Sequence, residues 1–82
     1  DAALAQAAQA FENIKTVLSE LGADTGDVLK TTVYLTHIAD FGEVNKLYAE
    51  VFGPDYPART CVEVSALPMG LSIEVECIAR AK

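Results

Sequence analysis

The sequence predicts an α+β fold in which two helices cover one face of a sheet, in the order helix, strand, helix, strand, strand. Residues 1–21 and 40–52 repeat apolar side chains at the three- and four-residue spacing of amphipathic helices. Residues 28–37 are rich in β-branched and aromatic side chains, which favour strands. Residues 59–66 and 71–80 alternate with a period of two, as strands do when their two faces differ.

The first helix is expected from Asp1 to Leu21, and Gly22 is the residue type that commonly ends a helix in a left-handed conformation. Its outer face should be polar: Gln6, Gln9, Asn13, Thr16 and Glu20. Its buried stripe should consist of the apolar residues, which are Leu4, Ala7, Phe11, Ile14, Val17, Leu18 and Leu21.

The second helix should begin at Asp40, with Glu43 completing a capping box, and end at Gly53-Pro54. Asn45 falls beside its apolar stripe, and by itself that position predicts exposure to solvent. The stripe comprises Phe41, Val44, Leu47, Tyr48, Val51 and Phe52.

The strand between the helices should turn Val33 and Leu35 towards them and place Thr32, Tyr34 and Thr36 on the polar side. His37, the one histidine of the chain, ends this strand. No cysteine or carboxylate stands at ligand spacing from it, so no metal site is predicted.

The last two strands are expected to form a hairpin closed over residues 67–70. This hairpin would set Ala66 opposite Leu71, Glu63 opposite Glu74, Cys61 opposite Glu76 and Thr60 opposite Cys77. The residues turned towards the helices would be Thr60, Val62, Val64 and Ala66 of the first strand and Leu71, Ile73, Val75, Cys77 and Ala79 of the second.

Arg59, Cys61, Glu63 and Glu74 would then share the other, polar face. Glutamates directly opposite each other repel. This face is therefore either the solvated side of the sheet or a site that uses those charges.

Composition limits the classes of function. Eighty-two residues form one domain, and the 51% hydrophobic content indicates either apolar surface covered by a partner chain or a densely packed monomer. A net charge of −6 disfavours nucleic-acid binding. No apolar run reaches the ~18 residues of a membrane span, and no signal peptide opens the chain.

The chain begins at Asp1 without Met, which predicts a processed chain or a fragment. Cys61 and Cys77 fall on opposite faces by the alternation, which predicts free thiols and a reducing cytoplasm.

Several segments resemble the Rid (reactive intermediate deaminase, formerly YjgF) family, and the resemblance covers nearly the whole chain. Less specific matches are residues 17–23, 27–35, 40–45 and 52–53. The most specific matches are Tyr56–Val64 with Leu67-Pro68, together with Ile73–Glu76.

The resemblance implies chorismate-mutase-like subunits that form a homotrimer with clefts between neighbours. It also implies hydrolysis of enamines and imines such as 2-aminoacrylate to 2-keto acids and ammonia, without a cofactor, as in a 2-iminobutanoate/2-iminopropanoate deaminase. Family members begin with a β-hairpin that residues 1–82 do not contain. The sequence is therefore interpreted as a single Rid-like domain lacking those strands.

Carried over by motif, Arg59 would bind the carboxylate of a small-molecule substrate, and Glu74 would position or activate water. Cys61 would line the pocket, chiefly through its backbone, and Asn45 would lie near the cleft.

The residue types suit this chemistry, because a guanidinium can bind a carboxylate through two parallel hydrogen bonds. A glutamate whose pKa is raised by neighbouring acids can move the protons that imine hydrolysis requires.

Three alternatives remain at this point. The chain could be a trimeric binding or regulatory module that uses Arg59 without turnover, or an inactive fragment. A nuclease or translation-inhibitor role is attached to some relatives, but the negative charge opposes it.

Overall fold

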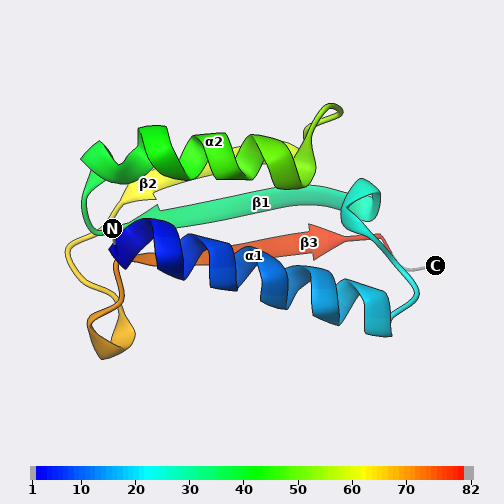
Figure 1. Ribbon diagram of the computed structural model, residues 1–82, viewed down its shortest axis with the longest axis horizontal. Helices are drawn as coiled ribbons and strands as arrows, with labels where there is room; N and C mark the ends of the chain where they lie inside the picture. Colours follow the sequence, from blue (N-terminus) through cyan, green and yellow to red (C-terminus); the bar gives the residue numbers. More distant parts are fainter. Residues whose placement is uncertain (1, 81–82) are drawn as a thin grey trace.

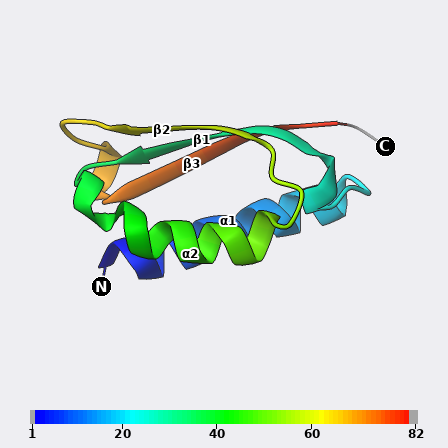
Figure 2. The same ribbon diagram turned by 90° about the horizontal axis from the view of Figure 1, so that it is seen from above.

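Two helices cover one face of a three-stranded sheet in the computed structural model, which describes residues 2–80 (Figure 1). Figure 2 shows the two layers edge-on, with the helices together on one side of the sheet. The predicted α+β fold and the order of its elements are confirmed. These elements are α1 (Ala2–Glu20), β1 (Val28–Leu35), α2 (Phe41–Phe52), β2 (Ala58–Glu63) and β3 (Ile73–Ala79), with short 3₁₀ turns η1 (Thr25–Asp27), η2 (Ile38–Asp40) and η3 (Pro68–Gly70).

The strand order β2-β1-β3 shows that the predicted hairpin is wrong. β1 lies in the centre, parallel to β2 and antiparallel to β3, so β2 and β3 do not pair with each other. The connection between them crosses the end of β1 instead. Val64 N–H donates to the carbonyl of Leu35 (2.8 Å), and Thr36 N–H donates to the carbonyl of Ser72 (3.1 Å).

The faces of β2 are also the reverse of the prediction. Thr31 and Val33, both buried under the helices, pair with Arg59 and Cys61, and residues paired across neighbouring strands project to the same face. Arg59, Cys61 and Glu63 therefore lie on the helix-covered side. Polar residues are tolerated there because β2 is an edge strand, and Arg59 and Glu63 remain exposed.

Strands β1 and β3 follow the predicted alternation. Val33 and Leu35 are buried against the helices, and Ile73 and Val75 pair with them on the same face. Glu74 and Glu76 occupy the opposite, open face of the sheet, as do the residues they pair with, Tyr34 and Thr32.

The core forms between α1, α2 and the covered face of the sheet. Phe11 of α1 contacts Phe52 edge to face, with ring centroids 5.7 Å apart. The predicted α1 stripe is only partly buried: Val17 is 54% exposed and Leu21, beyond the helix end, is 66% exposed. Leu4 and Ile14 are half-buried. The buried apolar residues are Ala3, Ala7, Phe11, Leu18, Val28, Val33, Leu35, Val44, Tyr48, Phe52 and Ile73.

The helix ends agree only in part with the prediction. Gly22 adopts the left-handed conformation expected after α1 (φ 74°), whereas the predicted start at Asp1 lies outside the described residues. The capping box of Asp40 and Glu43 is wrong, because Asp40 makes no side-chain capping bond. It has helical backbone angles at the end of η2, which leads directly into α2, whereas a capping residue is extended.

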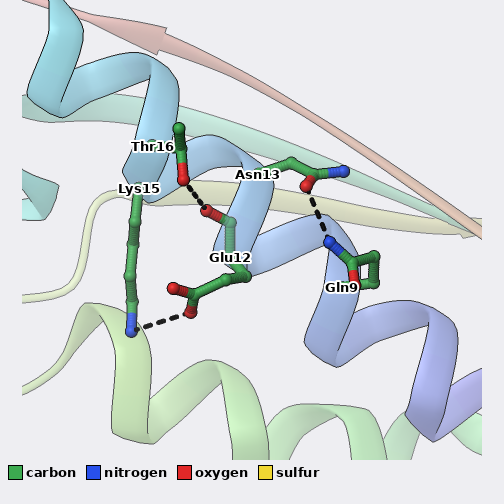
Figure 3. Close-up of polar contacts among 5 residues, drawn as sticks. All are labelled: Gln9, Glu12, Asn13, Lys15 and Thr16. Carbon is green, nitrogen blue, oxygen red and sulfur yellow. Dashed lines mark hydrogen bonds and ion pairs between the residues drawn. The ribbon is translucent and has the colours of Figure 1, made fainter.

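The outer face of α1 carries short-range polar contacts (Figure 3). Gln9 donates to Asn13 (2.8 Å), and Lys15 forms an ion pair with Glu12 at 3.8 Å. Gln6, predicted on this face, instead accepts a 2.7 Å hydrogen bond from the backbone N–H of Ser72. Its side chain thereby joins α1 to the start of β3.

Cys61 and Cys77 are free, as predicted. The reason differs from the expected one, since both side chains lie on the helix-covered face. They belong to the two outer strands, with β1 between them. No helix in the described part of the chain is long and apolar enough to span a membrane.

Candidate functional site

The site is organised around the guanidinium of Arg59, which extends from β2 to α2. Its central carbon lies 5.1 Å from the ring centroid of Phe41 and 4.7 Å from that of Tyr48. Its Nη1 donates a 2.6 Å hydrogen bond to Oδ1 of Asn45. Phe41, Asn45 and Tyr48 follow one another at four- and three-residue spacing, which places all three on one face of α2.

Asn45 is therefore not a freely solvated side chain. It is half-buried and bonded to Arg59, so the structure brings together two of the residues selected from the sequence. Phe41 and Tyr48 were expected only in the core. Their spacing from Asn45 is the signal that could have identified them as contacts of Arg59.

A pocket of about 460 Å³ opens beside Arg59. One side is aromatic, because Tyr56 stacks on Tyr48 with ring centroids 6.4 Å apart and an interplanar angle of 14°. Asn45 accepts from one of the five N–H groups of the guanidinium, and the side chain of Arg59 is exposed. This arrangement can receive a planar anion such as a carboxylate. The pocket is lined by Asn45, Tyr48, Ala49, Tyr56, Pro57 and Arg59.

Cys61 follows Arg59 along the same face of β2 and packs against the core. Burial raises the pKa of its thiol above the ordinary value, and the positive charge of Arg59 acts in the opposite direction. The thiol is accordingly neutral near pH 7, which suits a wall of a cleft better than a nucleophile. The pocket within one chain is lined without Cys61, so its predicted role in a cleft stays a prediction.

Glu74 does not share a face with Arg59, contrary to the prediction. It pairs with Tyr34 on the open face of β3, at the other edge of the sheet. There the Tyr34 hydroxyl donates to Glu76 (2.8 Å), and this hydrogen bond is the main cause that raises the pKa of Tyr34. Within one chain, the predicted anchor and the predicted acid are therefore separated.

Glu63 is likewise not opposite Glu74. Its Oε1 accepts a 2.8 Å hydrogen bond from the backbone N–H of Ile38, which begins η2. The carboxylate thus ties the end of β2 to the turn that leads into α2. It supports the elements that carry Asn45 and Phe41.

A second cavity, of about 470 Å³, lies between α1 and the outer edge of β3. Its wall is largely apolar, with Ile14, Val17 and Leu71 among the lining residues and Glu74 at the sheet side. Arg59 is absent from this lining. In residues 2–80, no three His, Cys, Asp or Glu side chains come together as metal ligands.

Comparison with known proteins identifies relatives over almost the full chain. The family model described as Endoribonuclease L-PSP matches residues 1–81. A RutC family protein of Pyrococcus abyssi is 50% identical over 74 residues, which cover 90% of this chain and 58% of that protein. A 2-iminobutanoate/2-iminopropanoate deaminase of Salmonella typhimurium is 44% identical over 78 residues, covering 92% of this chain and 61% of the relative.

Solved structures give the same result for the fold. The crystal structure of RidA from the Antarctic bacterium Psychrobacter sp. PAMC 21119 superimposes with a TM-score of 0.89 at 42% identity. The match covers 93% of this chain and 62% of the crystallised one. The chain thus spans about three-fifths of the length of the relatives that it matches.

Proposed function

Because the chain belongs to the Rid family and has the Rid fold, we propose that it serves the hydrolysis of reactive enamines and imines to 2-keto acids and ammonia. The observation that carries this proposal is the guanidinium of Arg59, held between two rings of α2 and bonded to Asn45 beside a pocket. The name of the Salmonella relative supports the same reaction class.

Arg59 acts in this proposal as the anchor of the substrate carboxylate. The guanidinium presents parallel N–H groups to the two carboxylate oxygens, and Asn45 holds its other end. Cys61 lines the cleft beside the anchor. No cofactor takes part, because the imine carbon is already electrophilic.

The reaction then requires a positioned water and a proton carrier. Water oxygen adds to the imine carbon, the C=N bond becomes single, and the nitrogen receives a proton. The hydroxyl proton of this adduct then moves to the nitrogen, and loss of ammonia forms the C=O bond of the 2-keto acid. We assign to Glu74 the removal of the water proton and its return to the nitrogen.

Arg59 and Glu74 face opposite sides of one sheet, so the proposed site needs two chains. We propose a homotrimer in which Arg59 of one subunit and Glu74 of the partner subunit meet in a cleft. The exposed position of both side chains supports this arrangement.

The test is release of 2-keto acid from freshly generated 2-aminoacrylate by the purified protein. Arg59→Ala removes a charge-assisted pair worth about 1.5–3 kcal/mol, so KM should rise and turnover fall. Arg59→Lys should restore little, because a point charge does not reproduce the planar fork. Glu74→Gln should keep substrate binding and lose hydrolysis.

Arg80→Ala and Glu50→Gln are matched controls, since both residues are exposed and lie outside the site. Unchanged hydrolysis in Arg59→Ala and Glu74→Gln would refute the proposal.

Two other outcomes would favour different functions. Ligand binding that needs Arg59, in a protein without turnover, would indicate a binding or regulatory module. RNA cleavage that survives Arg59→Ala would favour the nuclease named by the family model, although the net charge of −6 opposes RNA binding.

A further inference from the structure

Tyr48 lies at the boundary between the core and the site of Arg59. Its side chain is almost fully buried, and its hydroxyl shares a 2.8 Å hydrogen bond with the hydroxyl of Thr31, which is also buried. Buried hydroxyls are stable when they are paired with each other. This bond joins α2 to the central strand β1 and fixes the far end of the tyrosine ring.

Ring contacts hold Tyr48 from further directions. Phe52 lies 4.6 Å away in a tilted arrangement, Phe11 contacts it edge to face at 6.0 Å, and Tyr56 stacks on it at 6.4 Å. The central carbon of Arg59 then lies 4.7 Å from the centroid of this immobilised ring. The exposed arginine therefore rests on a surface that belongs to the core.

This arrangement matters because an exposed arginine has many rotamers. A ligand that binds a mobile guanidinium must also order it, and that ordering lowers affinity. A cation over an aromatic face is attracted by the ring and loses part of this freedom before the ligand arrives. Asn45 restricts the guanidinium further through its hydrogen bond.

We infer that Tyr48 is a positioning residue: its ring, locked by Thr31, pre-orients Arg59 to receive a carboxylate. The inference rests on the proposed function of Arg59 as the anchor. It assigns to the buried pair Thr31–Tyr48 a contribution to substrate affinity in addition to its contribution to folding.

Three variants separate the ring from the hydroxyl. Tyr48→Leu removes the aromatic face, Tyr48→Phe keeps the face without the hydroxyl bond, and Thr31→Val removes the bond from the other side. Leu18→Ala is the matched control, because Leu18 is a buried core residue on α1. Two quantities are measured: KM and kcat for imine hydrolysis, and the ¹⁵Nε order parameter of Arg59 by NMR.

Tyr48→Leu should raise KM roughly ten-fold, with a smaller change in kcat, and lower the order parameter of Arg59. Tyr48→Phe and Thr31→Val should raise KM only about two- to three-fold, because the ring is retained. Leu18→Ala should reduce stability while KM and the order parameter stay at the wild-type values.

An unchanged KM and order parameter in Tyr48→Leu would overturn the inference, as would an equal rise of KM in Leu18→Ala. If Tyr48→Leu does not fold, unchanged values in Thr31→Val overturn it instead.

The two hypotheses fail separately. Hydrolysis that does not depend on Arg59 refutes the proposed function. In that case the order parameter of Arg59 still tests whether Tyr48 positions the guanidinium. Loss of hydrolysis in Arg59→Ala with no effect of the Tyr48 and Thr31 variants refutes only the positioning role.

Discussion

Arg59 and Glu74 lie on opposite faces and at opposite edges of the same sheet. Arg59 pairs with Thr31 on the covered face of β1, whereas Glu74 pairs with Tyr34 on the open face. β1 separates the strands that carry them. A reaction that uses both residues must therefore take them from two chains, and this geometry can be tested directly.

Mixing two impaired variants should restore part of the hydrolytic activity. In an oligomer assembled at random from equal amounts of Arg59→Ala and Glu74→Gln chains, about a quarter of the shared sites contain both native residues. We expect hydrolysis at about a quarter of the wild-type rate after joint refolding, and a much lower rate from either variant alone. The measurement is 2-keto acid release before and after subunit exchange.

The double variant Arg59→Ala/Glu74→Gln, mixed with the wild type, controls for simple dilution. If subunit exchange, verified by mass spectrometry, gives no rate above that of the single variants, the two-chain site is wrong.

Substrate affinity should respond more to a negative charge at position 45 than to the loss of the Asn45 side chain. Asn45→Asp retains an oxygen acceptor for Arg59 but adds a negative charge that competes with the substrate carboxylate. KM should rise about ten-fold or more in Asn45→Asp and less in Asn45→Ala. Steady-state kinetics decide the matter, and a larger KM in the alanine variant would contradict the arrangement.

The thiols should report the charge of Arg59. Burial raises the pKa values of Cys61 and Cys77 above 9.0, and only Cys61 is also subject to the opposing charge of Arg59. Arg59→Ala should therefore move the alkylation midpoint of Cys61 to higher pH and leave that of Cys77 in place. Peptide mapping after iodoacetamide treatment at increasing pH measures both, and parallel shifts would argue against the interaction.

The same raised pKa values predict how stability depends on pH. The folded thiols retain their protons at a pH where the unfolded thiols lose them. Their contribution to stability is present below pH 9.0 and is lost as the pH rises through the higher folded pKa values. In urea denaturation above pH 9.0, the free energy of unfolding should fall less with rising pH in Cys77→Ala than in the wild type. An identical fall in both proteins would contradict the assignment.

Glu63 should stabilise η2, the turn that leads into α2. Glu63→Ala removes the acceptor of the Ile38 N–H and should lower the free energy of unfolding by about 0.5–1 kcal/mol. Glu63→Gln keeps an acceptor and should remain close to the wild type. Urea denaturation compares these variants with Glu50→Ala, a control at an exposed glutamate of α2. An unchanged free energy of unfolding in Glu63→Ala would show that the contact adds nothing.

The sequence alone predicted the elements and, at the site of Arg59, its neighbour Asn45. Helical spacing identified the buried side of α2, and the strand propensity of residues 28–37 identified β1, because local periodicity follows from backbone geometry. Gly22 marked the end of α1 because glycine readily adopts the left-handed conformation. The block around Tyr56–Val64 indicated the family.

Only the tertiary structure decided the pairing of strands and the side to which β2 turns its polar residues. A period of two shows that Arg59 and Thr60 point in opposite directions, but it does not show which of them faces the helices. That choice depends on the long-range pairing of β1 with both neighbours, which places β2 at an edge. At that edge Arg59 can cover Tyr48 and stay exposed, while Glu74 is on the far side of the sheet.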